Sequence, residues 1–222
     1  MNIAVIIATC GDQKWGKLAS ERAYPSADGQ CSTRPSVTIR HYPELSLAQA
    51  RNAAAWDAPI DDQTFFCFLD ADDELEPGYL AAMELAWMRG AITTDWAPLL
   101  VPAVRYVGPP RPDDVPASIP NRGRWPALNE CVIGTLVRAE LFRQVGGFRD
   151  YSGDLTPLSI YEDWDLFLRC YDAGAQLVYV EEAVYRAHVN PQGRNGGPDA
   201  KVVYDAIWAD HTTRTRDRSE LV

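Results

Sequence analysis

The sequence contains no run of about 20 apolar residues, the length that a membrane-spanning helix needs. No basic group precedes the apolar stretch 3–8 and no small-residue cleavage site follows it, so we expect no signal peptide and a cytoplasmic protein. Basic residues are few: 21 Lys and Arg stand against 31 Asp and Glu, for a formal net charge of −10. Binding to a nucleic-acid backbone needs the opposite balance, so we expect no nucleic-acid partner.

Cysteine and histidine are also scarce. The five cysteines are widely spaced and lack a C-x-x-C pair, so reduced thiols are expected rather than disulfides or a zinc site. The three histidines, His41, His188 and His211, leave few candidates for histidine-based chemistry. Apolar residues are plentiful at 46%, which excludes a disordered chain. Carboxylates are plentiful too, and they suit a site that binds a cation and, through the cation, a phosphorylated ligand.

The first part of the chain alternates strands and helices. Continuous apolar runs predict buried strands at 3–8, 37–41 and 65–69, and strong helix formers behind Ser46 predict a helix over 46–56. A short helix over 15–24, a loop over 24–35 and a helix between Pro77 and Gly90 complete this part. The alternation predicts a doubly wound α/β fold, in which ligands bind beyond the carboxyl ends of the strands.

The second part begins with a proline-rich stretch. Six prolines between 108 and 126 predict a long loop that crosses between two halves, residues 1–106 and 107–222. Beyond it, we expect helices over 138–145, 162–172 and 200–210, a strand over 176–180 and a glycine-rich loop over 191–198.

Three carboxylates, those of Asp70, Asp72 and Asp73, follow the strand at 65–69. They repel one another unless a cation or hydrogen-bond donors share the site, and in extended backbone Asp70 and Asp72 point to the same side. Oxygen ligands in this number suit Mg²⁺ or Mn²⁺. A solvated acidic turn, with Asp73 capping the next helix, is the alternative that the pattern leaves open. A calcium loop is excluded, because Leu75 and Ala81 stand where it has Gly and Glu.

Several segments, in order along nearly the whole chain, resemble the family 2 glycosyltransferases, which have the GT-A fold. Residues 68–77, F-L-D-A-D-D-E-L-E-P, resemble the family's D-x-D segment, and A-R-N at 50–52 resembles the helix before it. The stretch 129–148, ending in V-G-G-F, resembles the start of the acceptor half. Residues 161–169, Y-E-D-W-D-L-F-L-R, resemble the E-D-x-D-L-x-x-R helix, and 178–188 resemble the strand and turn that follow. The resemblance implies one compact α/β domain with a mixed, mostly parallel central sheet flanked by helices.

The resemblance also implies a function, the metal-dependent transfer of a sugar from a nucleoside-diphosphate sugar to an acceptor hydroxyl, with inversion. Residues 1–106 would bind donor and metal, and residues 107–222 would bind the acceptor and end in a lid and helix. Asp70 corresponds to a donor-binding carboxylate near the ribose, and Asp72 to a ligand of Mn²⁺ or Mg²⁺ on the diphosphate. Thr9 corresponds to a nucleoside contact and Arg51 to a residue against the base.

In the acceptor half, the resemblance makes Asp163 the general base that takes the proton of the acceptor hydroxyl. Glu162 corresponds to a residue that positions the acceptor, although acidic residues also suit a first helical turn. Apart from the resemblance, the aromatic ring of Trp164 offers a flat face to a sugar acceptor, with a core tryptophan as the alternative. His188 corresponds to a second metal ligand, with a packed or surface histidine as the alternative. The glycines between 191 and 199 predict a lid over the donor.

The chain also departs from the family pattern. The family's V-D-D-x-S segment, whose Asp reads the base, has no match between 24 and 40, so the base and the sugar stay open. The acceptor is a saccharide, a lipid-linked molecule or a protein. A sugar nucleotidyltransferase is an alternative function, but G-D-Q-K at 11–14 is a thin substitute for a glycine-rich phosphate loop. A catalytically weak sugar- or nucleotide-binding relative is another, against which the intact Asp70, Asp72 and Asp163 argue.

Overall fold

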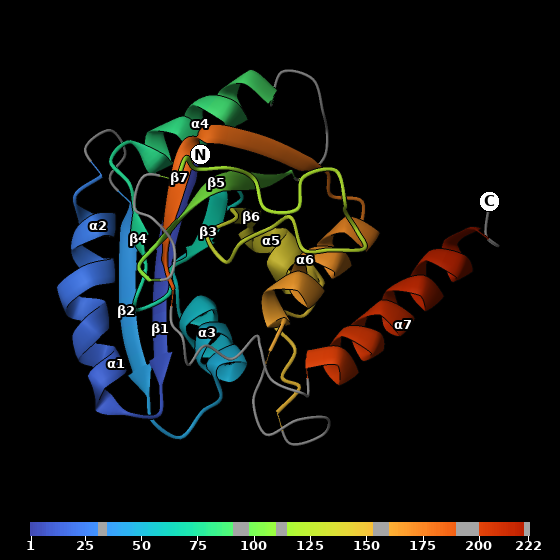
Figure 1. Ribbon diagram of the computed structural model, residues 1–222, viewed down its shortest axis with the longest axis horizontal. Coiled ribbons are helices and arrows are strands. Elements are labelled where there is room, and N and C mark those ends of the chain that lie inside the picture. Colours follow the sequence, from blue (N-terminus) through green and yellow to red (C-terminus); the bar gives the residue numbers. More distant parts are fainter. Residues whose placement is uncertain (31–34, 91–97, 110–114, 153–159, 190–199, 220–222) are drawn as a thin grey trace.

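The computed structural model describes residues 1–30, 35–90, 98–109, 115–152, 160–189 and 200–219. The elements follow one another along the chain (Figure 1) as β1 (Asn2–Cys10), α1 (Gln13–Leu18), the π-helical η1 (Ala19–Ala23), α2 (Tyr24–Asp28), β2 (Ser36–Tyr42), α3 (Leu47–Trp56), β3 (Thr64–Phe68), β4 (Glu74–Leu75), α4 (Tyr79–Gly90), β5 (Leu99–Val107), β6 (Val137–Arg138), α5 (Ala139–Gln144), α6 (Glu162–Asp172), β7 (Leu177–His188) and α7 (Ala200–Ser219).

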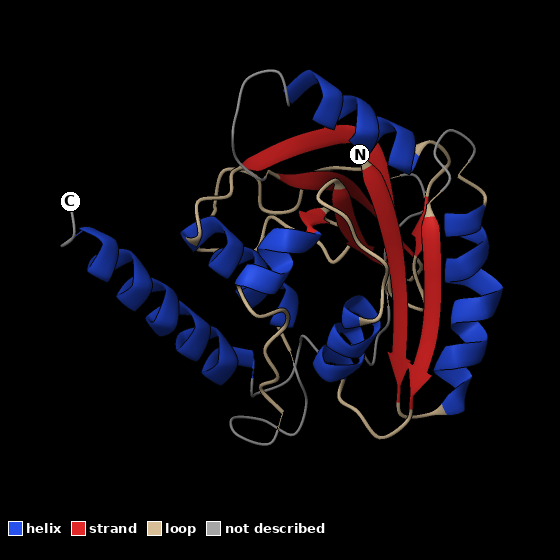
Figure 2. Cartoon of the chain, turned by 180° about the vertical axis from the view of Figure 1, so that it is seen from behind, coloured by secondary structure: helices blue, strands red, loops and turns tan. Residues whose placement is uncertain are grey.

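Two sheets form the centre of the molecule. The first has the strand order β2-β1-β3-β6, in which β1, β2 and β3 are parallel and β6 is antiparallel. Helices α1 and α3 lie on opposite sides of β1 and β2 (Figures 1 and 2), so β1 is covered on both faces and needs its continuous apolar sequence. The second sheet, β4-β7-β5, joins the first through a bridge between Leu100 and Leu136. The predicted mixed, mostly parallel α/β architecture is confirmed.

Several predicted elements need correction. The chain remains helical to Asp28, where a loop was expected from Tyr24 on, and Pro25 is tolerated because it stands at the start of α2. The predicted strand at 176–180 continues to His188, so this histidine ends a strand and does not lie on a turn. Strand β5 was not predicted, and α7 is longer than the expected helix over 200–210.

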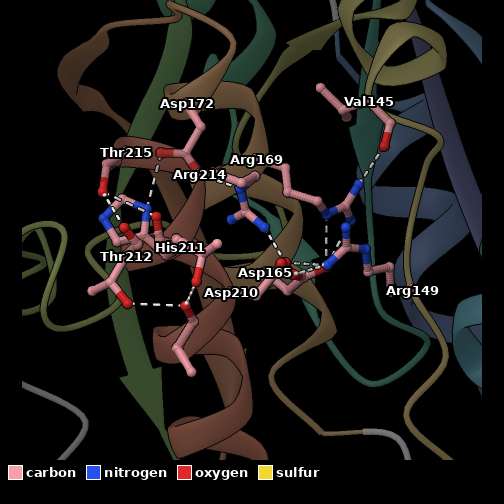
Figure 3. Close-up of polar contacts among 12 residues, drawn as sticks. Val145, Arg149, Asp165, Arg169, Asp172, Asp210, His211, Thr212, Arg214 and Thr215 are labelled. Carbon is pink, nitrogen blue, oxygen red and sulfur yellow. Dashed lines mark hydrogen bonds and ion pairs between the residues drawn. The ribbon is translucent and has the colours of Figure 1, made fainter. Parts of the chain in front are cut away.

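Ion pairs anchor α6 on two sides (Figure 3). Arg169 bonds Asp165 at 2.8 Å within the helix, and it also donates to the carbonyl oxygens of Val145 and Gly147 at 2.6 and 2.7 Å. On the outer side of α6, Asp172 pairs with Arg214 of α7 at 2.6 Å. The helix that carries the predicted general base in its first turn is therefore anchored at its middle and at its C-terminal end.

Two sequence predictions can be compared directly with the described residues. No helix among them is both long and apolar enough to cross a membrane. The cysteines within the described ranges, Cys10, Cys67, Cys131 and Cys170, are free thiols, as expected.

Candidate active site

One buried arginine links the two halves of the chain. Arg51 of α3 is 3% exposed, and it donates from Nη1 to Glu162 Oε1 at 2.8 Å and from Nη2 to Asp70. Burial alone lowers the pKa of Arg51, but the charges of Asp70 and Glu162 outweigh this effect and raise it, so the guanidinium stays charged. The end of β3 and the first residue of α6, 111 positions from Arg51, thus meet at one cation.

The neighbouring Asn52 makes a second link between the halves. Its side chain donates to the carbonyl oxygen of Phe148 and accepts the N–H of Phe148, both at 2.8 Å. Gly147 has a φ of 70°, and a Cβ there would lie 2.5 Å from Asn52 Oδ1, so this position requires glycine. The A-R-N and V-G-G-F segments, matched separately in the sequence, are therefore in direct contact.

The acidic segment forms a turn after β3, closed by a hydrogen bond from Asp73 N–H to the carbonyl oxygen of Asp70 at 3.2 Å. Tyr185 of β7 accepts the N–H of Asp70 and donates to Asp73 Oδ2 at 2.8 Å, while the N–H of His188 donates to Asp73 Oδ1 at 2.7 Å. Burial raises the pKa of Asp73 well above its usual range. Asp73 therefore fastens β7 to the turn, and it is not a helix cap, because α4 begins only at Tyr79.

Asp72 is half-buried on this turn, and its carboxylate has no ion pair among the described residues. Burial raises its pKa, the charge of Asp70 adds to the effect, and Arg22 and His188 oppose it. A cation would stabilise such a carboxylate. Within the described ranges, no three or more His, Cys, Asp or Glu side chains are grouped to hold a metal. Mg²⁺ commonly takes one or two protein carboxylates plus substrate phosphates, so the donor set fits a cation shared with a phosphorylated ligand.

His188 contacts Glu74, and its predicted role as a metal ligand stays a prediction. Its Nε2 lies 2.8 Å from Glu74 Oε2. Burial alone would raise the pKa of Glu74, but this hydrogen bond and the charge of Arg186 lower it. The N–H of His188 donates to Asp73 Oδ1 at 2.7 Å, which places this residue beside the acidic turn.

Asp163 lies half-buried in the first turn of α6. Its Oδ1 accepts the N–H of Trp164 at 2.7 Å, and its Oδ2 lies 3.4 Å from Asn129 Nδ2. Burial raises the pKa of Asp163 to about 6, and the charges of Glu162 and Asp70 act in the same direction. Such a carboxylate is ionised at neutral pH and still basic enough to accept a proton, as a general base requires.

Thr9 and Trp164 are both enclosed by protein. Thr9 is 2% exposed at the end of β1, and its hydroxyl lies 2.9 Å from His41 Nδ1 at the matching end of β2. Trp164 is 1% exposed and stacks on Tyr204 of α7 with ring centres 4.9 Å apart, so acceptor contact requires α7 to move. Their predicted binding roles stay predictions, and the predicted lid over 191–199 lies outside the described residues.

Sequence reasoning missed several polar residues of the site. Asn52 and Asn129 lie inside segments that match the family, so the motif matches could have indicated them as site residues. Tyr185 also lay within a matched stretch, but nothing local indicates that its hydroxyl reaches the acidic turn. Arg22 lies on η1 and donates to the carbonyl oxygen of Asp72 at 2.9 Å without belonging to any motif.

No protein-family model and no curated protein matches the sequence. Solved structures match the fold. Staphylococcus aureus TarS 1–349 in complex with UDP-GlcNAc has a TM-score of 0.62 at 15% identity, over 96% of this chain and 72% of that chain. A second structure of TarS 1–349 has a TM-score of 0.59 at 15% identity, over 85% of this chain and 60% of that one. GalNAc-T7 with UDP, GalNAc and Mn²⁺ has a TM-score of 0.57 at 14% identity, over 93% of this chain and 47% of that one.

The fold is therefore that of the GT-A glycosyltransferases, as the resemblance implied. The chain spans 60% of the length of one TarS 1–349 structure and 47% of the length of the GalNAc-T7 structure, which is less than two thirds of either.

Proposed function

We propose that this protein is a glycosyltransferase that moves a sugar from a nucleoside-diphosphate sugar to an acceptor hydroxyl, with inversion by direct displacement. The placement of Asp163 carries the proposal. This half-buried carboxylate with a pKa of about 6 lies next to Glu162, which Arg51 links to Asp70 on the acidic turn. Structures of similar fold contain UDP-GlcNAc, or UDP with Mn²⁺, which supports a nucleotide-sugar donor.

In the proposed reaction, Asp163 takes the proton of the acceptor hydroxyl while the hydroxyl oxygen attacks the anomeric carbon of the sugar. The bond between that carbon and the diphosphate oxygen breaks, and the nucleoside diphosphate leaves with the bonding electrons. Attack from the face opposite the leaving group inverts the anomeric centre. Glu162, held by Arg51 at 2.8 Å, is proposed to position the acceptor together with Trp164.

Donor binding is proposed for the first half, residues 1–106, and acceptor binding for residues 107–222. Thr9 and Asp70 contact the donor in this proposal, and Arg51 contributes through Asp70 because Arg51 is 3% exposed and bonds both Asp70 and Glu162. Asp72, with His188 as second ligand, would hold Mn²⁺ or Mg²⁺. When bound, that cation would neutralise part of the negative charge on the diphosphate.

A thermal-shift series with UDP-, GDP-, ADP- and dTDP-sugars, each with and without Mn²⁺, tests the proposal. A ligand that binds only the native state at 100 times its Kd adds about 2.7 kcal/mol of stability. We expect one nucleotide class to raise the melting temperature, and to do so only with the metal. No shift with any of them contradicts the proposal.

Product analysis then separates the alternatives. Transfer of the sugar to an acceptor supports a glycosyltransferase. Release of pyrophosphate from a nucleoside triphosphate and a sugar phosphate identifies a nucleotidyltransferase instead. Donor binding without any turnover identifies a catalytically weak relative.

A further inference from the structure

Arg22 contacts the acidic turn without a carboxylate partner among the described residues. Its Nη1 donates to the carbonyl oxygen of Asp72 at 2.9 Å, and its side chain is half-buried. Because Nη1 bonds the backbone of Asp72, the positive charge of Arg22 also lowers the pKa of the Asp72 carboxylate, against the raising effect of burial. A guanidinium has five N–H donors, so Arg22 retains donors for a ligand.

The other basic residues near the turn already contact carboxylates. Arg51 is buried between Asp70 and Glu162. Arg186 lies 3.5 Å from Glu74, and His188 lies 2.8 Å from the same carboxylate. Among the described residues, Arg22 is thus the arginine at this turn that forms no ion pair, although its charge acts on the nearby Asp72 carboxylate.

The backbone fixes Arg22 in this place. The Tyr24 N–H bonds the carbonyl oxygen of Ala19, a spacing of five residues, and such π-turns within helices occur frequently at functional sites. Ala19 and Ala23 are fully buried and set the rotation of the helix. Three residues after Ala23, Ser26 Oγ accepts the N–H of Leu75 at 3.1 Å, so the same helical run is tied to the chain just beyond the turn.

We propose that Arg22 binds the diphosphate of the nucleotide donor, an inference that rests on the proposed function. A diphosphate brings negative charge to a place where the carboxylates of Asp70, Asp72 and Asp73 already repel one another. A guanidinium beside Asp72 offsets part of that repulsion, and its planar N–H groups match two phosphate oxygens at once. A lysine at position 22 would keep the positive charge but lacks the planar pair of N–H groups that binds two oxygens at once.

Calorimetric titration with UDP and with uridine, in the presence of Mn²⁺, tests the inference; GDP, ADP or dTDP and their nucleosides replace them where UDP does not bind. The variants are R22A, R22Q and R22K. The matched control is K17A, which removes a cation from the same helical run, where Lys17 is 74% exposed and 3.7 Å from Glu21. Thermal unfolding checks that each variant is folded.

We expect R22A and R22Q to bind the diphosphate about 10-fold more weakly or worse, because a charge-assisted hydrogen bond is lost. Nucleoside affinity should stay unchanged, R22K should be intermediate and K17A should equal wild type. Equal losses for nucleoside and diphosphate, or no loss in R22A and R22Q, overturn the inference while leaving the proposed function intact. Absence of binding to every nucleotide by the wild type overturns the proposed function itself, and this inference with it.

Discussion

Replacing Asp163 with asparagine is expected to remove turnover and at the same time to stabilise the fold. Asparagine keeps the size of the side chain and still accepts the N–H of Trp164, which lies 2.7 Å from Oδ1. It cannot accept a proton, so the transfer rate should fall by about 10²-fold or more. Donor affinity should barely change, because the base acts on the acceptor oxygen.

The stabilisation follows from the pKa of Asp163, which is about 6 in the folded protein against an ordinary value of 3.8. An acid with a raised folded pKa stabilises the fold below its unfolded pKa, and this contribution is lost as the pH rises through the folded value. At about 1.4 kcal/mol per pH unit between these two values, ionised Asp163 costs roughly 2 to 3 kcal/mol above pH 7. Asparagine removes that cost, and its advantage should shrink to about half by pH 5.

Urea unfolding at pH 8 and pH 5, with transfer rate and donor affinity measured on the same preparations, checks this expectation. Asp165→Asn is the matched control, because Asp165 lies on the same helix and is paired with Arg169 at 2.8 Å. That variant should be less stable than wild type at both pH values. Near-normal transfer by Asp163→Asn, or lower stability than wild type at pH 8, would refute the assignment and direct attention to Glu162 or Asp165.

Arg51→Met should cost about 3–5 kcal/mol of unfolding free energy in urea, because it removes the buried cation between Asp70 and Glu162, and Arg51→Lys should recover part of it; equal stability to wild type would contradict this. Asp72→Ala should abolish Mn²⁺-dependent UDP binding in calorimetry while the fold survives, and binding as tight as wild type would remove Asp72 from the metal site. Tyr204→Ala should speed amide hydrogen exchange in α7 but not in β1, because it removes the ring stacked on Trp164; unchanged exchange in α7 would show that this stacking does not hold the helix.

The parts of the fold that the sequence predicted well have local signals. Helix α6 has its predicted bounds, 162–172, because acidic residues begin it and Gly174, with a φ of 103°, stands just past its end. Strand β5 was missed because Pro102 lies inside it, and proline argues against an interior strand. In the structure, the pairing of β5 with β7 is irregular between Pro102 and Ala103, which is where a sheet can accommodate proline.

The site was predictable in its members but not in their contacts. Motif matches identified Arg51, Asp70 and Glu162 separately, and only the tertiary fold brings them together. The burial of Trp164 was also unpredictable, since it depends on where α7 packs. Local sequence patterns predict which residues belong to a motif and which segments are helical. A contact between residues more than a hundred positions apart, such as Arg51 and Glu162, depends on the whole fold.

Four carboxylates of this protein, those of Asp72, Asp163, Asp165 and Asp172, differ in how their burial is compensated. Asp165 pairs with Arg169 within α6, and Arg169 also bonds the carbonyl oxygen of Val145 just after α5. Asp172 pairs with Arg214 and so joins α6 to α7. Asp72 and Asp163 are also sheltered from water, but neither has an ion pair among the described residues, and burial raises both pKa values. Burying a carboxylate without a cationic partner lowers stability, and such carboxylates are kept mainly where function needs their charge. Asp72 and Asp163 thus differ from Asp73, which also has no ion pair among the described residues but is held by the Tyr185 hydroxyl and the His188 N–H.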